Sequence, residues 1–320
     1  MPPILEMISV VKTFKVRSSG ATVRAVDGVS LLINRNETLG LAGESGCGKT
    51  TLSRMIMGLN HPSNGAIRFD GNDLSQLNHQ QYSHYRRNVQ MVFQDPYASL
   101  NPRKTVGETL SLAFEVHEPG SSVDITARVC KLLEDMDLQP SSTFLTRFPH
   151  QLSGGQRQRV AIARAISLNP QIVVADEAVA ALDMSIRAEI LNLLKAAQAR
   201  SGASYLFVSH DLSVLRNMCD RVGIMYLGRL VELSTSTQLF SNPKHPYTKA
   251  LLAATLAPNP HIERSRKRIV LSGEATFTAE SAQGCRFSSR CPLAQEQCYV
   301  HAPDLKDVGS GHQVACHFPG

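Results

Sequence analysis

The stretch GESGCGKT, from Gly43 to Thr50, constrains this chain more than any other feature of its sequence. It matches a glycine-rich loop closed by Gly-Lys-Thr, a pattern that binds phosphate when it joins a β-strand to an α-helix. The apolar run Thr38 to Ala42 predicts a buried parallel strand before the loop, and the apolar spacing from Thr50 to Leu59 predicts a helix after it. An α/β domain that binds a nucleotide is therefore expected.

Phosphate chemistry assigns roles within this loop. Its backbone amides are expected to cradle phosphate oxygens at the positive end of the following helix. Lys49 is expected to reach the β and γ phosphates of ATP, and the hydroxyl of Thr50 to ligate Mg²⁺. The predicted nucleotide-binding residues of the loop are Gly43, Ser45, Gly46, Cys47, Gly48, Lys49, Thr50 and Thr51.

A second apolar run, in QIVVADE, predicts a strand from Ile172 to Ala175 that ends in two carboxylates. Ligands of open α/β sheets gather at the carboxyl ends of the strands. Asp176 is therefore expected to hold Mg²⁺ through its waters, and Glu177 to act as the general base that polarises an attacking water.

The stretch HQLSGGQRQRVAIARAIS predicts a helix that opens at Ser153, Gly154 and Gly155. A serine and two glycines at a helix start form a second anion-binding group of backbone amides. The chain thus carries two phosphate half-sites, and a partner molecule that completes each of them is the simplest account.

The order and spacing of four stretches resemble those of ABC transporter ATPase subunits. These stretches are GESGCGKTT at 43–51, LSGGQ at 152–156, DEAVAALD at 176–183 and LFVSHDLSVL at 206–215. The resemblance implies an α/β P-loop fold with a RecA-like core, an antiparallel β subdomain and a helical subdomain. It also adds Gln156, within the signature LSGGQ, to the residues that bind a nucleotide.

Further site residues are implied only by this resemblance. Gln94 corresponds to a glutamine that contacts Mg²⁺ and the catalytic water, and Asp183 to an aspartate that communicates across the dimer. His210 corresponds to a histidine that contacts the γ phosphate. Phe14 takes the place of an aromatic ring that stacks on adenine, with packing in the core as the competing interpretation.

One departure from the family occurs in DEAVAALD, where the family more often has Pro at Ala178 and Ser at Ala180. Neither residue supplies a charge to the chemistry. Because both carboxylates, the lysine and the histidine are present, an active ATPase is expected.

Two further stretches resemble the oligopeptide, dipeptide and nickel importer ATPases. These are MVFQDPYASLNPRKTVGETL and the His-Pro-Tyr stretch at 242–258. The resemblance implies a nucleotide-binding domain over 1–240 with a helical insert at about 105–150, followed by an extension over 241–320. Within the extension, Leu251, Leu252 and Leu256 predict an amphipathic helix packed on the domain.

The resemblance implies an ATP-hydrolysing subunit that energises import of a peptide or a related small solute. The implied partners are a second ATPase subunit, with a heterodimer favoured over a homodimer, two transmembrane permease subunits and, indirectly, an extracytoplasmic solute-binding protein. The implied location is peripheral, on the cytoplasmic face of the bacterial inner membrane. The alternative function is a soluble ABC-type ATPase that remodels nucleic acid or ribosomes.

Composition bears on these alternatives. The formal charge of +6 is spread along the chain apart from the basic run ERSRKR at 263–268, so no nucleic-acid partner is expected. The amino terminus carries no signal-peptide pattern, and no apolar stretch reaches the length of a membrane span. Neither a coiled-coil heptad repeat nor a second cassette supports the soluble alternative.

Four of the seven cysteines lie within the last 36 residues, at Cys285, Cys291, Cys298 and Cys316. A chain without export features disfavours disulfides, and free cysteine is normally an interior residue, so a shared ligand is expected. The spacing is wider than that of the CxxC pairs of structural zinc. A [4Fe-4S] cluster, which the resemblance to peptide-importer ATPases also suggests, is favoured over Zn²⁺.

Overall fold

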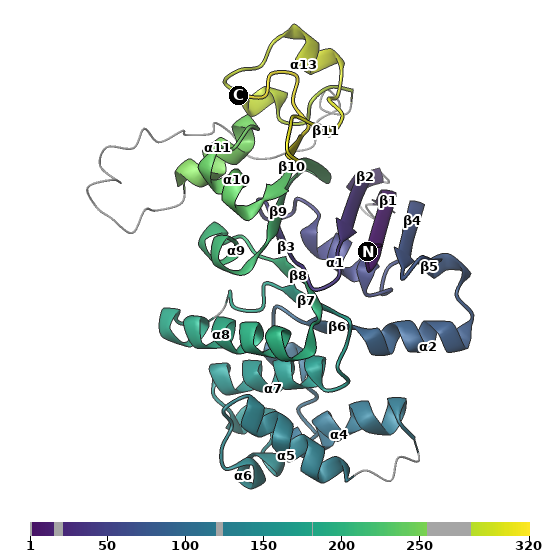
Figure 1. Ribbon diagram of the computed structural model, residues 1–320, viewed down its shortest axis with the longest axis vertical. Helices are drawn as coiled ribbons and strands as arrows, with labels where there is room; N and C mark the ends of the chain where they lie inside the picture. Colours follow the sequence, from purple (N-terminus) through teal and green to yellow (C-terminus); the bar gives the residue numbers. More distant parts are fainter. Residues whose placement is uncertain (1, 16–21, 120–123, 181, 255–282) are drawn as a thin grey trace. The chain divides into compact units, whose positions relative to one another are not determined.

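The computed structural model describes residues 2–15, 22–119, 124–180, 182–254 and 283–320, and the chain divides into two compact units (Figure 1). Unit 1 consists of the first four residues, Ile33–Glu37 and Gln76–Val208. Unit 2 consists of Leu5–Leu32, Thr38–Ser75 and Ser209–Gly320. Both units mix strands and helices, which confirms the predicted α/β class.

Unit 1 is built on three parallel strands in the order β8-β7-β6, which lie side by side in Figure 1. They are β6 (Val89–Val92), β7 (Ile172–Asp176) and β8 (Ser204–Val208). Every residue of β7 and β8 is buried, which explains their continuous apolar sequence. The strand predicted at Ile172 is therefore present, and it delivers Asp176 to its carboxyl end.

Helices make up most of the remainder of unit 1. They are α2 (His79–Asn88), α3 (Pro96–Ser99), α4 (Val106–His117), α5 (Ile125–Asp135), α6 (Ser141–Leu145), α7 (Gly154–Ile166) and α8 (Met184–Ser201), with the 3₁₀ turn η2 (Pro149–Gln151). The Thr105 hydroxyl accepts from the Glu108 amide, and the Glu108 carboxylate accepts from the Thr105 amide, so α4 begins in a capping box. Helices α4, α5 and α6 pack together within the stretch predicted to be helical.

Unit 2 contains a four-stranded sheet in the order β2-β1-β4-β5. Its strands are β1 (Leu5–Lys15), β2 (Thr22–Ile33), β4 (Asn64–Phe69) and β5 (Asn72–Asp73), with the 3₁₀ turn η1 (Leu74–Gln76) following in the chain. Strand β1 pairs antiparallel with β4, and β4 pairs antiparallel with β5. These strands form the predicted antiparallel β subdomain, and β1 carries Phe14.

A second set of strands in unit 2 runs in the order β11-β12-β10-β9-β3. Its members are β3 (Thr38–Ala42), β9 (Arg221–Tyr226), β10 (Arg229–Thr235), β11 (Lys306–Asp307) and β12 (Gln313–Val314). Strand β3 is parallel to β9, whereas β10 pairs antiparallel with both β9 and β12. The C-terminal extension therefore adds its own strands to those that follow the phosphate-binding stretch.

The helical elements of unit 2 are α1 (Lys49–Ile56), α9 (Leu212–Met218), α10 (Ser236–Ser241), α11 (Pro246–Ala254), the 3₁₀ turn η4 (Ser288–Arg290) and α13 (Glu296–Val300). The predicted apolar stripe of α11 is wrong in detail. Tyr247, Thr248 and Ala250 form its buried face, whereas Leu251 and Leu252 are only half-buried. A tyrosine hydroxyl with a hydrogen-bond partner allowed the polar-tipped residue to face inward.

Two features singled out in the sequence, Leu256 of the predicted amphipathic helix and the basic run 263–268, lie outside the described residues. Among the residues that are described, no helix combines the length and apolar content that a membrane crossing requires.

Candidate functional site

The glycine-rich loop joins β3 to α1, as the sequence predicted, and its backbone leaves no room for a side chain at Gly48. This residue caps α1 with φ of 109°, and a Cβ there would lie 2.2 Å from the carbonyl oxygen of Ala25. Only glycine meets both conditions, because L-residues rarely adopt this φ. The Ala25 carbonyl oxygen therefore lies against the last loop residue, directly before the first backbone amides of α1.

Lys49 is buried, with 5% of its surface exposed, and its ammonium is turned into the loop. Its Nζ donates to the carbonyl oxygen of Gly43 at 2.7 Å and to that of Glu44 at 2.9 Å. A buried cation requires oxygen partners, and here the loop itself supplies them. Lys49 thus places a positive charge at the loop, and phosphate oxygens are the ligands that suit such a site.

The other predicted residues of the loop divide by exposure. Ser45, Gly46 and Thr50 are exposed and open to a ligand, and Thr51 is half-buried. Cys47 is 3% exposed, and burial raises the pKa of its thiol. Cys47 therefore contributes backbone and packing to the loop rather than a reactive side chain.

The predicted catalytic residues of unit 1 meet at the end of β7. Gln94 Nε2 donates to Glu177 Oε2 at 2.7 Å, although 83 residues separate them. Glu177 has a positive φ of 48°, and its amide donates to the Val208 carbonyl oxygen at 2.9 Å. Asp176, just before it, is 2% exposed. A non-glycine residue held at positive φ beside a buried carboxylate is typical of a functional site.

The signature stretch begins α7, with Ser153 at the N-cap. The Ser153 hydroxyl accepts from the Gln156 amide at 3.3 Å, and Gln156 Oε1 accepts from the Ser153 amide at 3.1 Å. At Gly155 a Cβ would lie 2.8 Å from Ile186 Cγ2, whereas at Gly154 it would meet no atom within 4 Å. Gly155 therefore serves packing against α8, and Gly154 leaves an open surface at the helix start.

Three residues implied by family resemblance are exposed. Phe14 is 42% exposed, and Lys12 Nζ lies 5.4 Å from its ring centroid. Its exposure excludes the competing core-packing interpretation. His210 follows β8 in the chain and belongs to unit 2, and Asp183 precedes α8 in unit 1.

Cys285, Cys291, Cys298 and Cys316 line one small cavity, together with His245. The four cysteines are free thiols, and burial raises the pKa of the Cys285 thiol to about 11. However, no group of three or more His, Cys, Asp or Glu side chains in the described part of the chain is arranged to hold a metal ion. The expected iron–sulfur or zinc centre is thus not supported by this geometry, although the thiols do converge.

The sequence interpretation missed two residues, Tyr247 and Arg290, that contact the loop from within unit 2. Glu44, inside the loop, receives hydrogen bonds from Arg290 and donates one to Tyr247. The charge of Glu44 within the loop is visible in the sequence, but no sequence pattern pairs it with Arg290.

A glycine-rich loop between a parallel strand and a helix, with an acidic strand end and a second glycine-opened helix, defines a nucleoside triphosphatase cassette. Two family models match the chain: "ABC transporter" over residues 26–180 and "Oligopeptide/dipeptide transporter, C-terminal region" over residues 231–298.

Curated relatives extend over nearly the whole chain. It is 46% identical to the oligopeptide transport ATP-binding protein AppF of Bacillus subtilis, over 98% of this chain and 97% of that protein. It is 42% identical to the dipeptide transport ATP-binding protein DppF of Haemophilus influenzae, over 98% of this chain and 96% of that protein.

Solved structures with a similar fold include the dimeric bacterial ABC transporter cassette MJ0796, with a TM-score of 0.66 and 30% identity over 72% of this chain and 98% of that one. Another is cbiO1 of Clostridium perfringens, part of the transporter complex cbiONQ, with a TM-score of 0.65 and 28% identity over 76% and 92% of the two chains. The chain belongs to the ABC transporter family, among its ATP-binding subunits that carry the oligopeptide/dipeptide C-terminal region. It is an ATP-hydrolysing transport enzyme, as predicted.

Proposed function

We propose that this chain hydrolyses ATP to drive import of peptides, or of a related small solute, across the bacterial inner membrane. The observation that carries the proposal is the buried Lys49, held on loop carbonyl oxygens at the start of α1. The names of AppF and DppF, as oligopeptide and dipeptide transport ATP-binding proteins, and the match of the C-terminal region support peptides as the solute class.

We assign the hydrolysis step to Glu177, which lies at the carboxyl end of β7 in unit 1. Glu177 takes a proton from water as the water oxygen bonds to the γ phosphorus, and the bond from that phosphorus to the bridging oxygen breaks. The released electron pair stays on ADP. The Gln94 amide, 2.7 Å from Glu177 Oε2, orients the carboxylate for this transfer.

Other residues bind and orient the nucleotide in this proposal. Mg²⁺ would be held by Thr50, Gln94 and Asp176 and would neutralise phosphate charge when bound. The exposed ring of Phe14 is assigned to adenine, and the imidazole of His210 to the γ phosphate.

The open surface at Gly154 supports a partner that completes the second phosphate half-site. We assign this role to a second ATPase subunit, with a heterodimer favoured over a homodimer, and Asp183 to communication between the two. The remaining proposed partners are two permease subunits and an indirect solute-binding protein, with the chain peripheral on the cytoplasmic face. No nucleic-acid partner is proposed.

For the four-cysteine cavity we propose a [4Fe-4S] cluster, with Zn²⁺ as the alternative. Four thiols around one cavity are the donor set that both groups require, although their present arrangement is not a ready metal site. Anaerobic purification should give a brown protein that contains iron and sulfide. A colourless preparation with stoichiometric zinc would replace the cluster by zinc, and one with neither would remove both.

Substitution of Lys49 tests the proposed function. Lys49→Ala should weaken equilibrium binding of MgATP to the full chain by about tenfold to hundredfold, because a charge-assisted contact to phosphate is lost. Lys131→Ala, on an exposed face of α5, is the matched control and should change affinity by less than about twofold. Reconstituted with its transmembrane partners, the Lys49→Ala chain should also fail to support uptake of labelled dipeptides. Unchanged ATP affinity would contradict the site, and normal uptake would contradict the transport role.

A further inference from the structure

Glu44 places a negative charge inside a loop that is built to receive phosphate. All three of its polar groups are engaged within unit 2. Its amide donates to the hydroxyl of Tyr247 at 2.9 Å, and its carbonyl oxygen accepts from Lys49 Nζ at 2.9 Å. Its carboxylate accepts from Arg290 Nη1 at 3.0 and 3.2 Å. The conformation of the loop at Glu44 is therefore set from the C-terminal extension.

The contact between Glu44 and Arg290 is largely shielded from water. The Arg290 side chain is 10% exposed and that of Glu44 is 30% exposed, and Arg290 also bonds the Tyr226 hydroxyl at 3.3 Å. Salt and water screen a partly buried pair less than an exposed one, so the guanidinium of Arg290 offsets the negative charge of the Glu44 carboxylate. Without Arg290, an uncompensated carboxylate would remain beside the phosphate position.

A cluster of aromatic rings holds both partners of Glu44 in place. The ring centroid of Tyr226 lies 4.6 Å from that of Tyr247 and 5.3 Å from that of Phe287, and Tyr247 and Phe287 are 5.4 Å apart. All three side chains are at most 1% exposed. Such packing restricts the rings and with them the hydroxyl of Tyr247 and the chain leading to Arg290.

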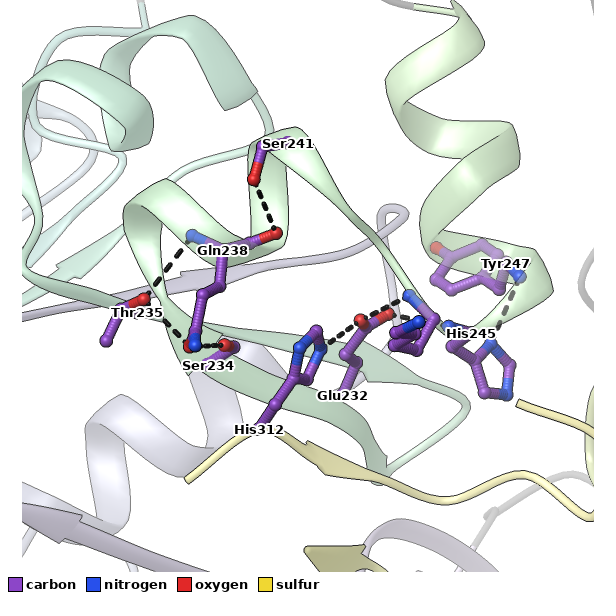
Figure 2. A network of polar contacts seen from close by, with 9 residues as sticks. Glu232, Ser234, Thr235, Gln238, Ser241, His245, Tyr247 and His312 are labelled. Carbon is purple, nitrogen blue, oxygen red and sulfur yellow. Dashed lines mark hydrogen bonds and ion pairs between the residues drawn. The ribbon is translucent and has the colours of Figure 1, made fainter. Parts of the chain in front are cut away.

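A buried carboxylate of β10 fixes the start of α11, as Figure 2 shows. Glu232 is fully buried and accepts from the amides of Lys244 at 2.7 Å and His245 at 2.9 Å, while His312 Nε2 lies 2.6 Å from its Oε1. His245 Nδ1 in turn accepts from the Tyr247 amide at 3.1 Å. A continuous series of hydrogen bonds therefore leads from Glu232 through His245 and Tyr247 to the phosphate loop.

The turn between β9 and β10 holds the loop at a second point, and the extension contacts that turn. The Gly228 amide donates to the Cys47 carbonyl oxygen at 2.8 Å, and Arg286 donates to the adjacent carbonyl oxygen of Leu227. Arg286 is further paired with the buried Asp27. Arg290 thus contacts the loop directly, whereas Arg286, four residues earlier, contacts the turn that bonds the loop.

We propose that Arg290 and Tyr247 are positioning residues for nucleotide binding, with Arg290 neutralising Glu44 so that the loop accepts the phosphates. This inference rests on the proposed role of the loop as the ATP site.

A pair of substitutions in the full chain tests the charge role of Arg290. Arg290→Met should weaken binding of MgATP, MgADP and inorganic triphosphate by about tenfold each, because repulsion from Glu44 acts on phosphate rather than on adenine. Adding Glu44→Gln to Arg290→Met should restore affinity to within about threefold of wild type, since the repulsive charge is removed. A purely structural role would not give this restoration.

Arg128→Met is the matched control, because Arg128 is likewise a partly buried arginine paired with a glutamate, in this case Glu118 of unit 1. It should change ATP affinity by less than about twofold. If Arg290→Met does not fold, as judged by circular dichroism, Arg290→Gln replaces it, because it also removes the charge, with the same expected loss of about tenfold and the same restoration by Glu44→Gln.

The proposal is overturned if Arg290→Met binds the three ligands normally, or if Glu44→Gln fails to restore their binding. Lys49→Ala, measured in parallel, separates this inference from the proposed function. Weak binding by Lys49→Ala with normal binding by Arg290→Met would reject only the positioning role. Normal binding by both variants would reject the ATP site as well.

Discussion

The phosphate loop and the signature stretch both present backbone amides at the start of a helix, but they are held in different ways. Glu44 in the phosphate loop is bonded by Tyr247 and Arg290, which lie 203 and 246 residues away. The signature stretch is held by a capping box between Ser153 and Gln156, three residues apart. The first site is thus supported by the chain's own extension, whereas the second is supported locally.

Exposure also differs between the two sites. In the phosphate loop, the side chains of Lys49 and Cys47 are buried and hydrogen-bonded within the loop, whereas Ser45 and Gly46 are exposed. In the signature stretch, Ser153 and Gly154 are exposed, and a side chain added at Gly154 would meet open space. A site that is firmly held binds its ligand with little reorganisation, and an open surface is suited to a ligand brought by another molecule.

The largest expected effect separates hydrolysis from binding. Glu177→Gln should lower turnover in the reconstituted transporter by about 10² to 10⁴, because an amide cannot take a proton from water. ATP affinity should stay within about threefold of wild type, since the phosphate loop is unchanged. Single-turnover hydrolysis and equilibrium binding measure the two quantities. Turnover within threefold of wild type would remove Glu177 from the role of general base.

A smaller effect tests whether Phe14 of the same chain contacts the adenine base of the nucleotide. Phe14→Ala should weaken ATP binding by about fivefold to a hundredfold, the range expected for loss of one stacked base. Binding of inorganic triphosphate, which has no base, should be unchanged and serves as the control. Equal losses for both ligands would show that Phe14 acts on the loop rather than on adenine.

The free energy of unfolding tests the ion pair between Asp27 and Arg286 of the extension. Burial alone raises the pKa of Asp27, but the guanidinium of Arg286, followed by those of Arg229 and Arg24, outweighs it and lowers the net pKa. Asp27→Asn should therefore cost about 1–3 kcal/mol in the free energy of unfolding at neutral pH.

The pH dependence of that cost has a definite sign. The unfolded carboxyl titrates near 3.8, so the stabilisation is complete above that pH and is lost as pH falls through the lower folded pKa. Wild type and Asp27→Asn should therefore converge in acid. Urea denaturation followed by circular dichroism is the measurement, because the chain contains no tryptophan. A difference that grows toward low pH would contradict the assignment.

Local features of the fold were predictable from the sequence because their signals are local. The strand Thr38–Ala42 matches its prediction residue for residue, and Ser153 caps α7 as expected, since apolar runs and capping residues act within a few positions. The pairing of Gln94 with Glu177 required more than spacing, because only the family resemblance brought these residues together before the structure did.

The remaining features depend on tertiary packing. No spacing rule joins Arg290 to Glu44, and the burial of Tyr247 in place of Leu251 follows from a hydroxyl that finds the Glu44 amide. The close approach of Ile186, on a neighbouring helix, to Gly155 is likewise a tertiary contact. Long-range polar contacts of this kind leave no periodic pattern in the sequence.

Gly154→Glu gives the smallest expected effect on the chain alone and the most direct test of the contrast between the two sites. A glutamate at this exposed helix start should leave MgATP affinity of the isolated chain within about twofold of wild type, because the phosphate loop does not use the signature stretch. In the assembled transporter the same variant should lower turnover by at least about tenfold, because the added charge opposes the partner's nucleotide. Loss of ATP affinity in the isolated chain, or full turnover in the assembled transporter, would contradict the division into a self-supported site and an open one.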